Sequence, residues 1–111
     1  MGRERKGINQ YEVFWITLDP TEGSEMAKTR PCVVISPNEM NDYLQTVIIA
    51  PLTSTTKPLP SRVKVLFNGQ YNMIALDHIR SVSKSRIENY IGKLKAPEIE
   101  VIKETLKEMF C

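Results

Sequence analysis

The sequence predicts a mainly β fold of the α+β class, in which a small curled sheet or barrel is covered by one C-terminal amphipathic helix. Short apolar runs of strand length recur along most of the chain, and turn residues separate them. Strands at short intervals followed by one helix pack as layers around one core. At 111 residues the chain fits a single domain over residues 1–111, in which residues 1–8 are expected to be a flexible arm.

Three strands are predicted in the first half. Tyr11–Leu18 is dense in β-branched and aromatic residues and stops before Pro20, which cannot donate to a ladder. The polar segment 21–29 is expected to be a loop. Pro31–Ser36 and Thr46–Leu52 are continuous apolar runs, which are typical of strands buried on both faces.

A hairpin is predicted in the second half. Arg62–Phe67 begins with alternating polar and apolar residues, and Asn68-Gly69 is a turn signal before Met73–Leu76. Two paired antiparallel strands follow from this pattern. Earlier in the chain, Asn38 is expected to cap one helical turn.

The last third is predicted to hold two short strands and a helix. Ile79–Val82 and Tyr90–Leu94 are the strand candidates, while 85–89 fits a helical turn equally well. Pro97 suits the first turn of a helix over Glu98–Phe110. The apolar residues expected to face the core recur at spacings of three and four: Ile99, Ile102, Leu106 and Met109.

Charge and cysteine content exclude several classes of protein. The formal net charge is only +2, so any anion must be held by a local cluster of basic side chains. No run approaches the roughly 20 apolar residues that span a bilayer, and the N-terminus lacks an apolar signal core, so we expect a cytoplasmic protein without membrane contact. Cys32 and Cys111 are the only cysteines and His78 is the only histidine, which favours neither a disulfide framework nor a metal site, and no cofactor is expected.

Arg30 is a candidate phosphate ligand because it directly precedes Pro31 at the mouth of a buried strand. A guanidinium stays charged and offers a planar fork of donors, so it can hold a phosphate and stabilise a phosphorane. The alternative interpretation is a surface ion pair with Glu25. The hydroxyl-rich segment from Thr53 could hydrogen-bond phosphate oxygens, and its alternative is an ordinary Ser/Thr-rich linker.

A second group of candidates is Asp77, His78 and Arg80, which are close in sequence and offer acid–base chemistry. The alternatives are a turn-capping aspartate and a surface histidine. Among the aromatic residues, Tyr43 and Tyr71 fall in expected loops and are the better candidates for stacking on bases.

Several segments together form a recognisable signature. It opens with Asp-Pro-Thr-Glu-Gly-Ser-Glu at 19–25, followed by Lys-Thr-Arg-Pro at 28–31 and Val-Val-Ile-Ser-Pro at 33–37. It continues through Ala-Pro-Leu-Thr-Ser at 50–54 and Ala-Leu-Asp-His-Ile-Arg-Ser-Val at 75–82. Over about residues 9 to 110 the chain therefore resembles the MazF/PemK family of toxins.

This resemblance implies an SH3-like, CcdB-type small β-barrel with an appended helix, a homodimer, and a metal-independent endoribonuclease without cofactor. Such a toxin cuts single-stranded mRNA at a short preferred sequence. The resemblance also implies a toxin–antitoxin system whose cognate antitoxin has a disordered acidic tail that occupies the RNA groove.

By the same resemblance, Arg30 matches the family's catalytic arginine and Thr53 its catalytic threonine. Glu25 matches a loop glutamate important for toxicity, and Asp77 matches a carboxylate that the PemK branch is thought to use as a base. The residues expected to bind substrate are Glu25, Lys28, Thr29, Ser54 and Asp77.

The chain also departs from the family pattern. Ala75 stands where the PemK branch has an arginine, and Leu18 or Asp19 falls where that branch has a catalytic histidine. Thr29 replaces a histidine of some relatives, and Ser54 replaces the second threonine of a pair.

The resulting hypothesis is cleavage by the RNA's own 2′-hydroxyl, which leaves a cyclic phosphate and a free 5′-hydroxyl. Arg30 would bind the nonbridging oxygens, Thr53 would orient the phosphate, and Glu25 or Asp77 would help accept the proton. One competing hypothesis is a CcdB-like poison of DNA gyrase, but those relatives carry a tryptophan near the C-terminus, whereas the only tryptophan here is Trp15. Another is a non-catalytic nucleic-acid-binding barrel.

Overall fold

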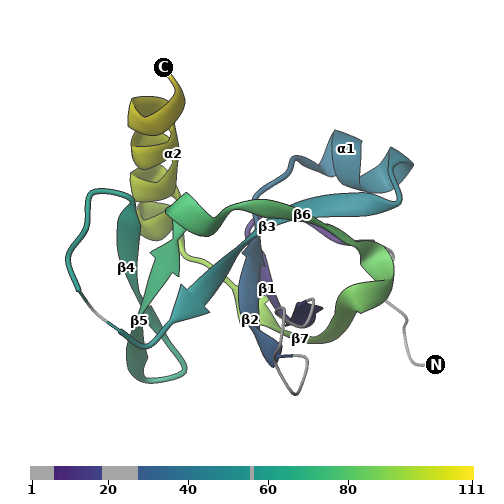
Figure 1. The fold of residues 1–111 in the computed structure, drawn as a ribbon, viewed down its shortest axis with the longest axis horizontal. Coiled ribbons are helices and arrows are strands. Elements are labelled where there is room, and N and C mark those ends of the chain that lie inside the picture. Colours follow the sequence, from purple (N-terminus) through teal and green to yellow (C-terminus); the bar gives the residue numbers. More distant parts are fainter. Residues whose placement is uncertain (1–6, 19–27, 56) are drawn as a thin grey trace, which may run out of the picture.

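The computed structural model describes residues 7–18, 28–55 and 57–111. These residues form an antiparallel sheet with a short helix and a C-terminal helix (Figure 1). In chain order the elements are β1 (Glu12–Leu18), β2 (Lys28–Val34), α1 (Asn38–Tyr43), β3 (Thr46–Thr53), β4 (Arg62–Phe67), β5 (Gln70–Ala75), the 3₁₀ turn η1 (Leu76–His78), β6 (Arg80–Ser83), the 3₁₀ turn η2 (Lys84–Arg86), β7 (Ile87–Lys93) and α2 (Ala96–Phe110).

The strands hydrogen-bond in the order β4-β5-β3-β2-β1-β7, and β6 pairs separately with the first half of β3. The predicted mainly β fold with a C-terminal helix is therefore confirmed, and so is the β4–β5 hairpin. The sheet does not form a closed barrel. The described strands curl, but β4 and β7, at the two ends of the strand order, do not pair with each other. The two ends approach through side chains instead, since a Cβ on Gly92 of β7 would lie 3.2 Å from the Phe67 ring of β4.

The interior divides into two clusters on opposite faces of β2 and β3, which confirms that these two strands are buried on both faces. Between the sheet and α2 lies the helix-side core, whose buried members are Val13, Val33, Ile35, Ala50, Leu52, Val63, Val65, Ile74, Leu76, Leu94 and Ile102. On the other face lies the second core, made of Phe14, Ile16, Cys32, Val34, Val47, Ile49 and Val82.

The start of β2 differs from the prediction. Lys28 and Thr29 were expected in a loop, but they belong to the strand because β1 pairs with them, Leu18 with Lys28 and Thr17 with Thr29. Pairing with a neighbouring strand outweighs their polar composition. The rest of the predicted loop, 21–27, lies outside the described residues.

At the N-terminus, residues 1–6 of the expected arm also lie outside the described residues. Ile8 packs against the second core, and its carbonyl accepts a hydrogen bond from the amide of Asn41 at 3.2 Å. The predicted cap at Asn38 is wrong: Pro37 precedes the first turn of α1, and the Asn38 side chain accepts from the backbone N–H of Gln10 at 2.7 Å.

Helix α2 begins as predicted, with Pro97 in its first turn. The Glu98 carboxylate accepts from the backbone N–H of Lys95 at 2.9 Å and from that of Leu66 in β4 at 3.2 Å, so it both caps the helix and joins it to the sheet. Met109 was expected to face the core but is exposed, because the last turn of α2 extends beyond the sheet (Figure 1). Within the described residues, neither helix is both long enough and apolar enough to cross a membrane.

The packing of α2 gives a stability prediction. Ile102 is fully buried in the helix-side core, whereas its neighbour Val101 is half exposed. Ile102→Ala should lower the free energy of unfolding by about 2–5 kcal/mol, because it removes buried methyl groups and leaves a cavity. Val101→Ala, the matched control, should change it by about 0.5 kcal/mol or less. Urea unfolding measures both, and equal effects of the two variants would contradict this packing.

Candidate functional site

The site lies where β3 leaves β2. The last residues paired in register between them are Cys32 and Pro51. Farther along, Ile35 donates its N–H to the Ile48 carbonyl, so every second residue of β2 counted from Ile35 turns its nitrogen toward β3. Pro31 occupies such a position and has no N–H, so the ladder cannot continue there. Beyond this point β3 pairs with β5 instead, and the two strands separate.

This separation leaves an open cavity of about 510 Å³. Arg30 and Thr53 each lie two residues beyond the last pair, so their side chains share the face of the sheet that carries the second core. Four of the predicted site residues meet at this cavity: Arg30, Thr53, Thr29 and Ser54. The remaining lining residues are Pro31, Leu52, Thr55 and Asn72.

The backbone of Arg30 is held in the sheet, and its side chain lines the cavity. It pairs with Ile16 of β1, which is completely buried. Among the described residues, no hydrogen-bond acceptor or carboxylate contacts its guanidinium, which is partly exposed to the cavity. Glu25, the partner in the alternative ion-pair interpretation, lies outside the described residues. A cation placed this way can bind an anionic ligand without first losing another partner.

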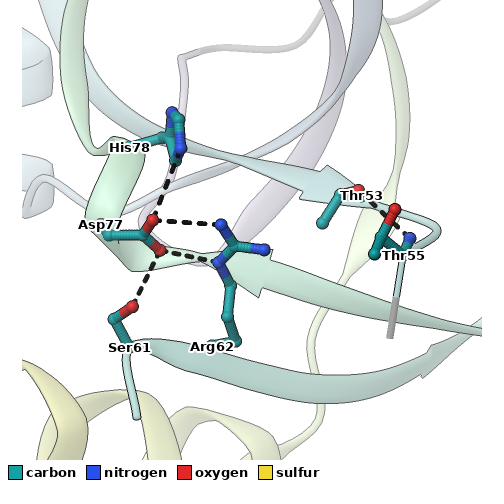
Figure 2. Close-up of polar contacts among 6 residues, drawn as sticks. All are labelled: Thr53, Thr55, Ser61, Arg62, Asp77 and His78. Atoms are coloured by element: carbon teal, nitrogen blue, oxygen red, sulfur yellow. Dashed lines mark hydrogen bonds and ion pairs between the residues drawn. The ribbon is translucent and has the colours of Figure 1, made fainter. Parts of the chain in front are cut away.

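The hydroxyl of Thr53 has a fixed orientation. Its oxygen accepts a hydrogen bond from the backbone N–H of Thr55 at 3.2 Å, which is the turn geometry expected of a threonine at a strand end (Figure 2). Because one lone pair is used in this way, the hydroxyl proton remains available to donate to a ligand oxygen.

The Thr29 hydroxyl presents a hydrogen-bond acceptor to the cavity, in contrast to the donor at Thr53. The Thr17 hydroxyl donates its only proton to the Glu88 carboxylate, and the Thr17 and Thr29 oxygens are 3.3 Å apart. Thr29 must therefore be the donor in that contact, which leaves it only acceptor capacity toward the cavity. The cavity thus presents both a hydrogen-bond donor at Thr53 and an acceptor at Thr29.

A second, smaller cavity of about 140 Å³ adjoins the same two central residues, and it is lined by Arg30, Pro51, Thr53, Arg62, Ala75 and His78. Asp77 lines neither cavity; it holds Arg62 in a bidentate pair, with Nε–Oδ1 at 2.7 Å and Nη2–Oδ2 at 3.1 Å (Figure 2). Ser61 donates to Asp77 at 2.9 Å, and Nε2 of His78 lies 3.4 Å from Asp77 Oδ2.

These contacts determine the protonation of Asp77. The hydrogen bond from Arg62 holds the pKa of the Asp77 carboxyl well below its usual range, with a further contribution from Ser61. A carboxylate with so low a pKa is a weak base, so Asp77 is poorly suited to accept a proton from substrate. It is well suited to orient Arg62 and His78.

Cys32 adjoins the site but does not take part in it. Burial raises the pKa of its thiol to about 12, although the positive charges of Arg30 and Arg80 act in the opposite direction. The group therefore stays a neutral thiol and is not a nucleophile. In residues 7–18, 28–55 and 57–111, no cluster of three or more His, Cys, Asp or Glu side chains is arranged to hold a metal ion.

Two of the residues that line the cavities, Asn72 and Arg62, were not predicted from the sequence. The Asn68-Gly69 turn sets the register of the hairpin, and that register pairs Arg62 with Ala75, two residues before Asp77. Counting back from the turn would have placed Arg62 next to Asp77. No comparable signal identifies Asn72. Of the predicted site residues, Glu25 and the side chain of Lys28 lie outside what the structure describes.

Known proteins show which family the chain belongs to. Residues 9–110 match the family described as the PemK-like, MazF-like toxin of type II toxin–antitoxin systems. The chain belongs to this family. It is 33% identical over 94 residues to the endoribonuclease toxin MazF of Escherichia coli strain K12, covering 83% of this chain and 84% of that one.

Solved structures show the same fold. MazF from Deinococcus radiodurans superposes with a TM-score of 0.78 at 23% identity, covering 95% of this chain and 97% of that chain. A MazE–MazF structure from the same organism has a TM-score of 0.76 at 24% identity and covers 91% of this chain and 93% of that chain.

The Asp77 contacts predict a pH-dependent stability. The folded-state pKa of Asp77 lies below its unfolded value of about 3.9, so the ionised carboxylate stabilises the fold above that pH. The contribution declines as the pH falls below about 4 and through the folded-state pKa. Wild type should therefore be more stable than Asp77→Asn at neutral pH, and the difference should shrink in acid.

Urea unfolding at a series of pH values measures this difference. Glu100→Gln, which removes an exposed carboxylate on α2, is the control for general charge effects. A stability difference between wild type and Asp77→Asn that is the same at pH 7 and at pH 2 would rule out the proposed ion pair.

Proposed function

We propose that this toxin is an endoribonuclease that cleaves single-stranded mRNA at a preferred sequence, without a metal ion. The observation that carries the proposal is that two side chains converge on one open cavity: the Arg30 guanidinium, which has no acceptor among the described residues, and the Thr53 hydroxyl, whose oxygen accepts from the N–H of Thr55. The name of the E. coli relative, an endoribonuclease toxin, supports the same activity.

RNA supplies its own nucleophile, so the protein needs only to align the 2′-hydroxyl with phosphorus and stabilise the charge that develops. Arg30 binds the nonbridging oxygens of the scissile phosphate, where its planar fork fits two oxygens at once. Thr53 donates its hydroxyl proton to one of these oxygens and fixes the phosphate. The products are a 2′,3′-cyclic phosphate and a 5′-hydroxyl.

The neighbouring residues contact the nucleotides on either side. Thr29 can only accept toward the cavity, so it binds a donor of the RNA, either a 2′-hydroxyl or a base N–H. Ser54 and Asn72 line the same cavity and read exposed base edges or sugars. Lys28 is assigned to the phosphate backbone, since a lysine acts there as a point charge.

The carboxylates are assigned different roles. The low pKa of Asp77 favours a structural role in which it positions Arg62. Glu25 is then the better candidate to accept the proton of the 2′-hydroxyl, as its match to the family's loop glutamate suggests.

The family also implies partners and a compartment. The toxin is neutralised by a cognate antitoxin whose acidic disordered tail folds into the RNA site, where its carboxylates would meet the Arg30 guanidinium. It acts in the cytoplasm, where mRNA is found, and as a homodimer. The ribonuclease function is preferred over gyrase poisoning and over non-catalytic binding because both reactive side chains reach one cavity.

The first functional prediction concerns Arg30. In excess chelator, the purified protein should cut a long single-stranded RNA at discrete positions and leave the matching DNA intact. Arg30→Ala should lower the cleavage rate by about a hundred- to a thousand-fold, because a preorganised charge on the phosphate is lost. Arg30→Lys should be intermediate, since it keeps the charge but loses the fork.

Lys107→Ala on α2 is the surface control, and thermal unfolding of each variant checks the fold. Arg30→Ala should unfold at nearly the wild-type temperature, because its guanidinium makes no described contact that stabilises the fold. Full activity of a folded Arg30→Ala protein would contradict the proposal.

The second prediction concerns the Thr53 hydroxyl. Thr53→Val keeps the shape of the side chain but removes the donor, and it should slow cleavage by about 10- to 100-fold, the value of one hydrogen bond to a charged group. Thr53→Ser should retain most of the activity. Single-turnover cleavage of a short RNA measures both, and a Val variant as fast as the Ser variant would show that the hydroxyl makes no contact with the reacting phosphate.

A further inference from the structure

The two cavities share Arg30 and Thr53, so a phosphate bound between these residues borders both spaces. The larger cavity has room for nucleotides. The smaller one, at about 140 Å³, adds only two polar side chains, Arg62 and His78. Arg62 has two of its three guanidinium nitrogens on Asp77, and in Figure 2 the third is turned away from Asp77, on the side of Thr53.

Proton donors are scarce around this phosphate. Among the described residues that line the two cavities, His78 is the only one with an imidazole, the side chain that most often serves as a general acid or base. The arginines stay charged, and the hydroxyl and amide side chains neither gain nor release protons readily. The departing 5′-oxygen of RNA is an alkoxide, a strong base, and its departure is much faster when an acid protonates it.

His78 is positioned for this task by its neighbours. It ends η1, which begins at Leu76, a residue with 0% exposure in the helix-side core. Its Nε2 lies 3.4 Å from Asp77 Oδ2, and Asp77 is itself fixed by Arg62 and Ser61. Because the carboxylate contacts the ring at Nε2, Nδ1 is the ring nitrogen left to face a substrate. The ring itself is 64% exposed, so substrate can reach it.

We propose that His78 is the general acid of the cleavage reaction and delivers a proton to the 5′-oxygen leaving group. This assignment rests on the proposed ribonuclease function. In the step, the bond from the 2′-oxygen to phosphorus forms and the bond from phosphorus to the 5′-oxygen breaks. The 5′-oxygen keeps the electron pair and takes a proton from Nδ1 of His78, and the imidazole regains a proton from solvent. The 2′-hydroxyl proton leaves with the base that activates the 2′-oxygen.

The test replaces the leaving group. Two short RNAs carry the mapped cut site, one natural and one with sulfur in place of the bridging 5′-oxygen at the scissile phosphate. A thiolate is a much weaker base than an alkoxide, so its departure needs no proton donor. Wild type, His78→Gln, Arg30→Ala and Lys107→Ala are compared on both RNAs in single-turnover reactions.

His78→Gln should be slower than wild type by about 100-fold or more on the natural RNA and within several-fold of wild type on the sulfur RNA. Arg30→Ala should be slow on both, because its role does not depend on the leaving group, and Lys107→Ala should match wild type on both. An equal loss for His78→Gln on the two RNAs would identify His78 as a phosphate contact and overturn the assignment. Unchanged rates on both would overturn it too.

Failure of the proposed function gives a different pattern. If wild type cuts neither RNA, the ribonuclease proposal fails and the role of His78 fails with it. The exposure of His78 makes Gln at this position compatible with the fold, which thermal unfolding of His78→Gln verifies.

Discussion

The missing N–H of Pro31 is the constraint on which the site depends. With an ordinary residue at that position, β2 and β3 could pair for another two residues, and Arg30 and Thr53 would lie side by side in a regular ladder. Because the ladder stops at Cys32 and Pro51, β3 turns to β5 and a cavity opens between the strand ends. The residues on either side of this opening belong to strands that are buried on both faces. Their backbones are therefore fixed, and only their side chains are free to adjust to a ligand.

Arg62 and Arg30 differ in whether a carboxylate pairs with their guanidinium group. Arg62 is held by Asp77 in a bidentate pair, whereas Arg30 has no such partner among the described residues. The paired arginine is fixed in place, and the unpaired one keeps its full capacity to bind an anion. Asp77 thereby acts through its neighbours: its depressed pKa keeps it ionised, and the ionised carboxylate fixes Arg62 and lies beside His78.

The sequence was sufficient for elements whose signal is local. The Asn68-Gly69 turn, the apolar runs of β2 and β3 and the spacing of Ile99, Ile102 and Leu106 in α2 each predicted the element that the structure contains. The sequence was insufficient where the structure of a segment depends on its pairing with distant segments. The start of β2 at Lys28 depends on β1, and the open edge between β4 and β7 depends on the curl of the whole sheet. The arrangement of Arg62, Asp77 and His78 required the hairpin register together with the 3₁₀ turn that follows it.

In the proposed mechanism, Arg30 and Thr53 hold a phosphate for attack by the adjacent 2′-hydroxyl. The most direct measurement uses an RNA in which only the nucleotide 5′ to the mapped cut carries a 2′-hydrogen, together with the unmodified RNA. The modified RNA should bind with unchanged affinity but should not be cut at that bond, while the unmodified RNA should yield a 2′,3′-cyclic phosphate end. Cleavage of the modified bond at a comparable rate would show that water or a protein side chain is the nucleophile and would contradict the account.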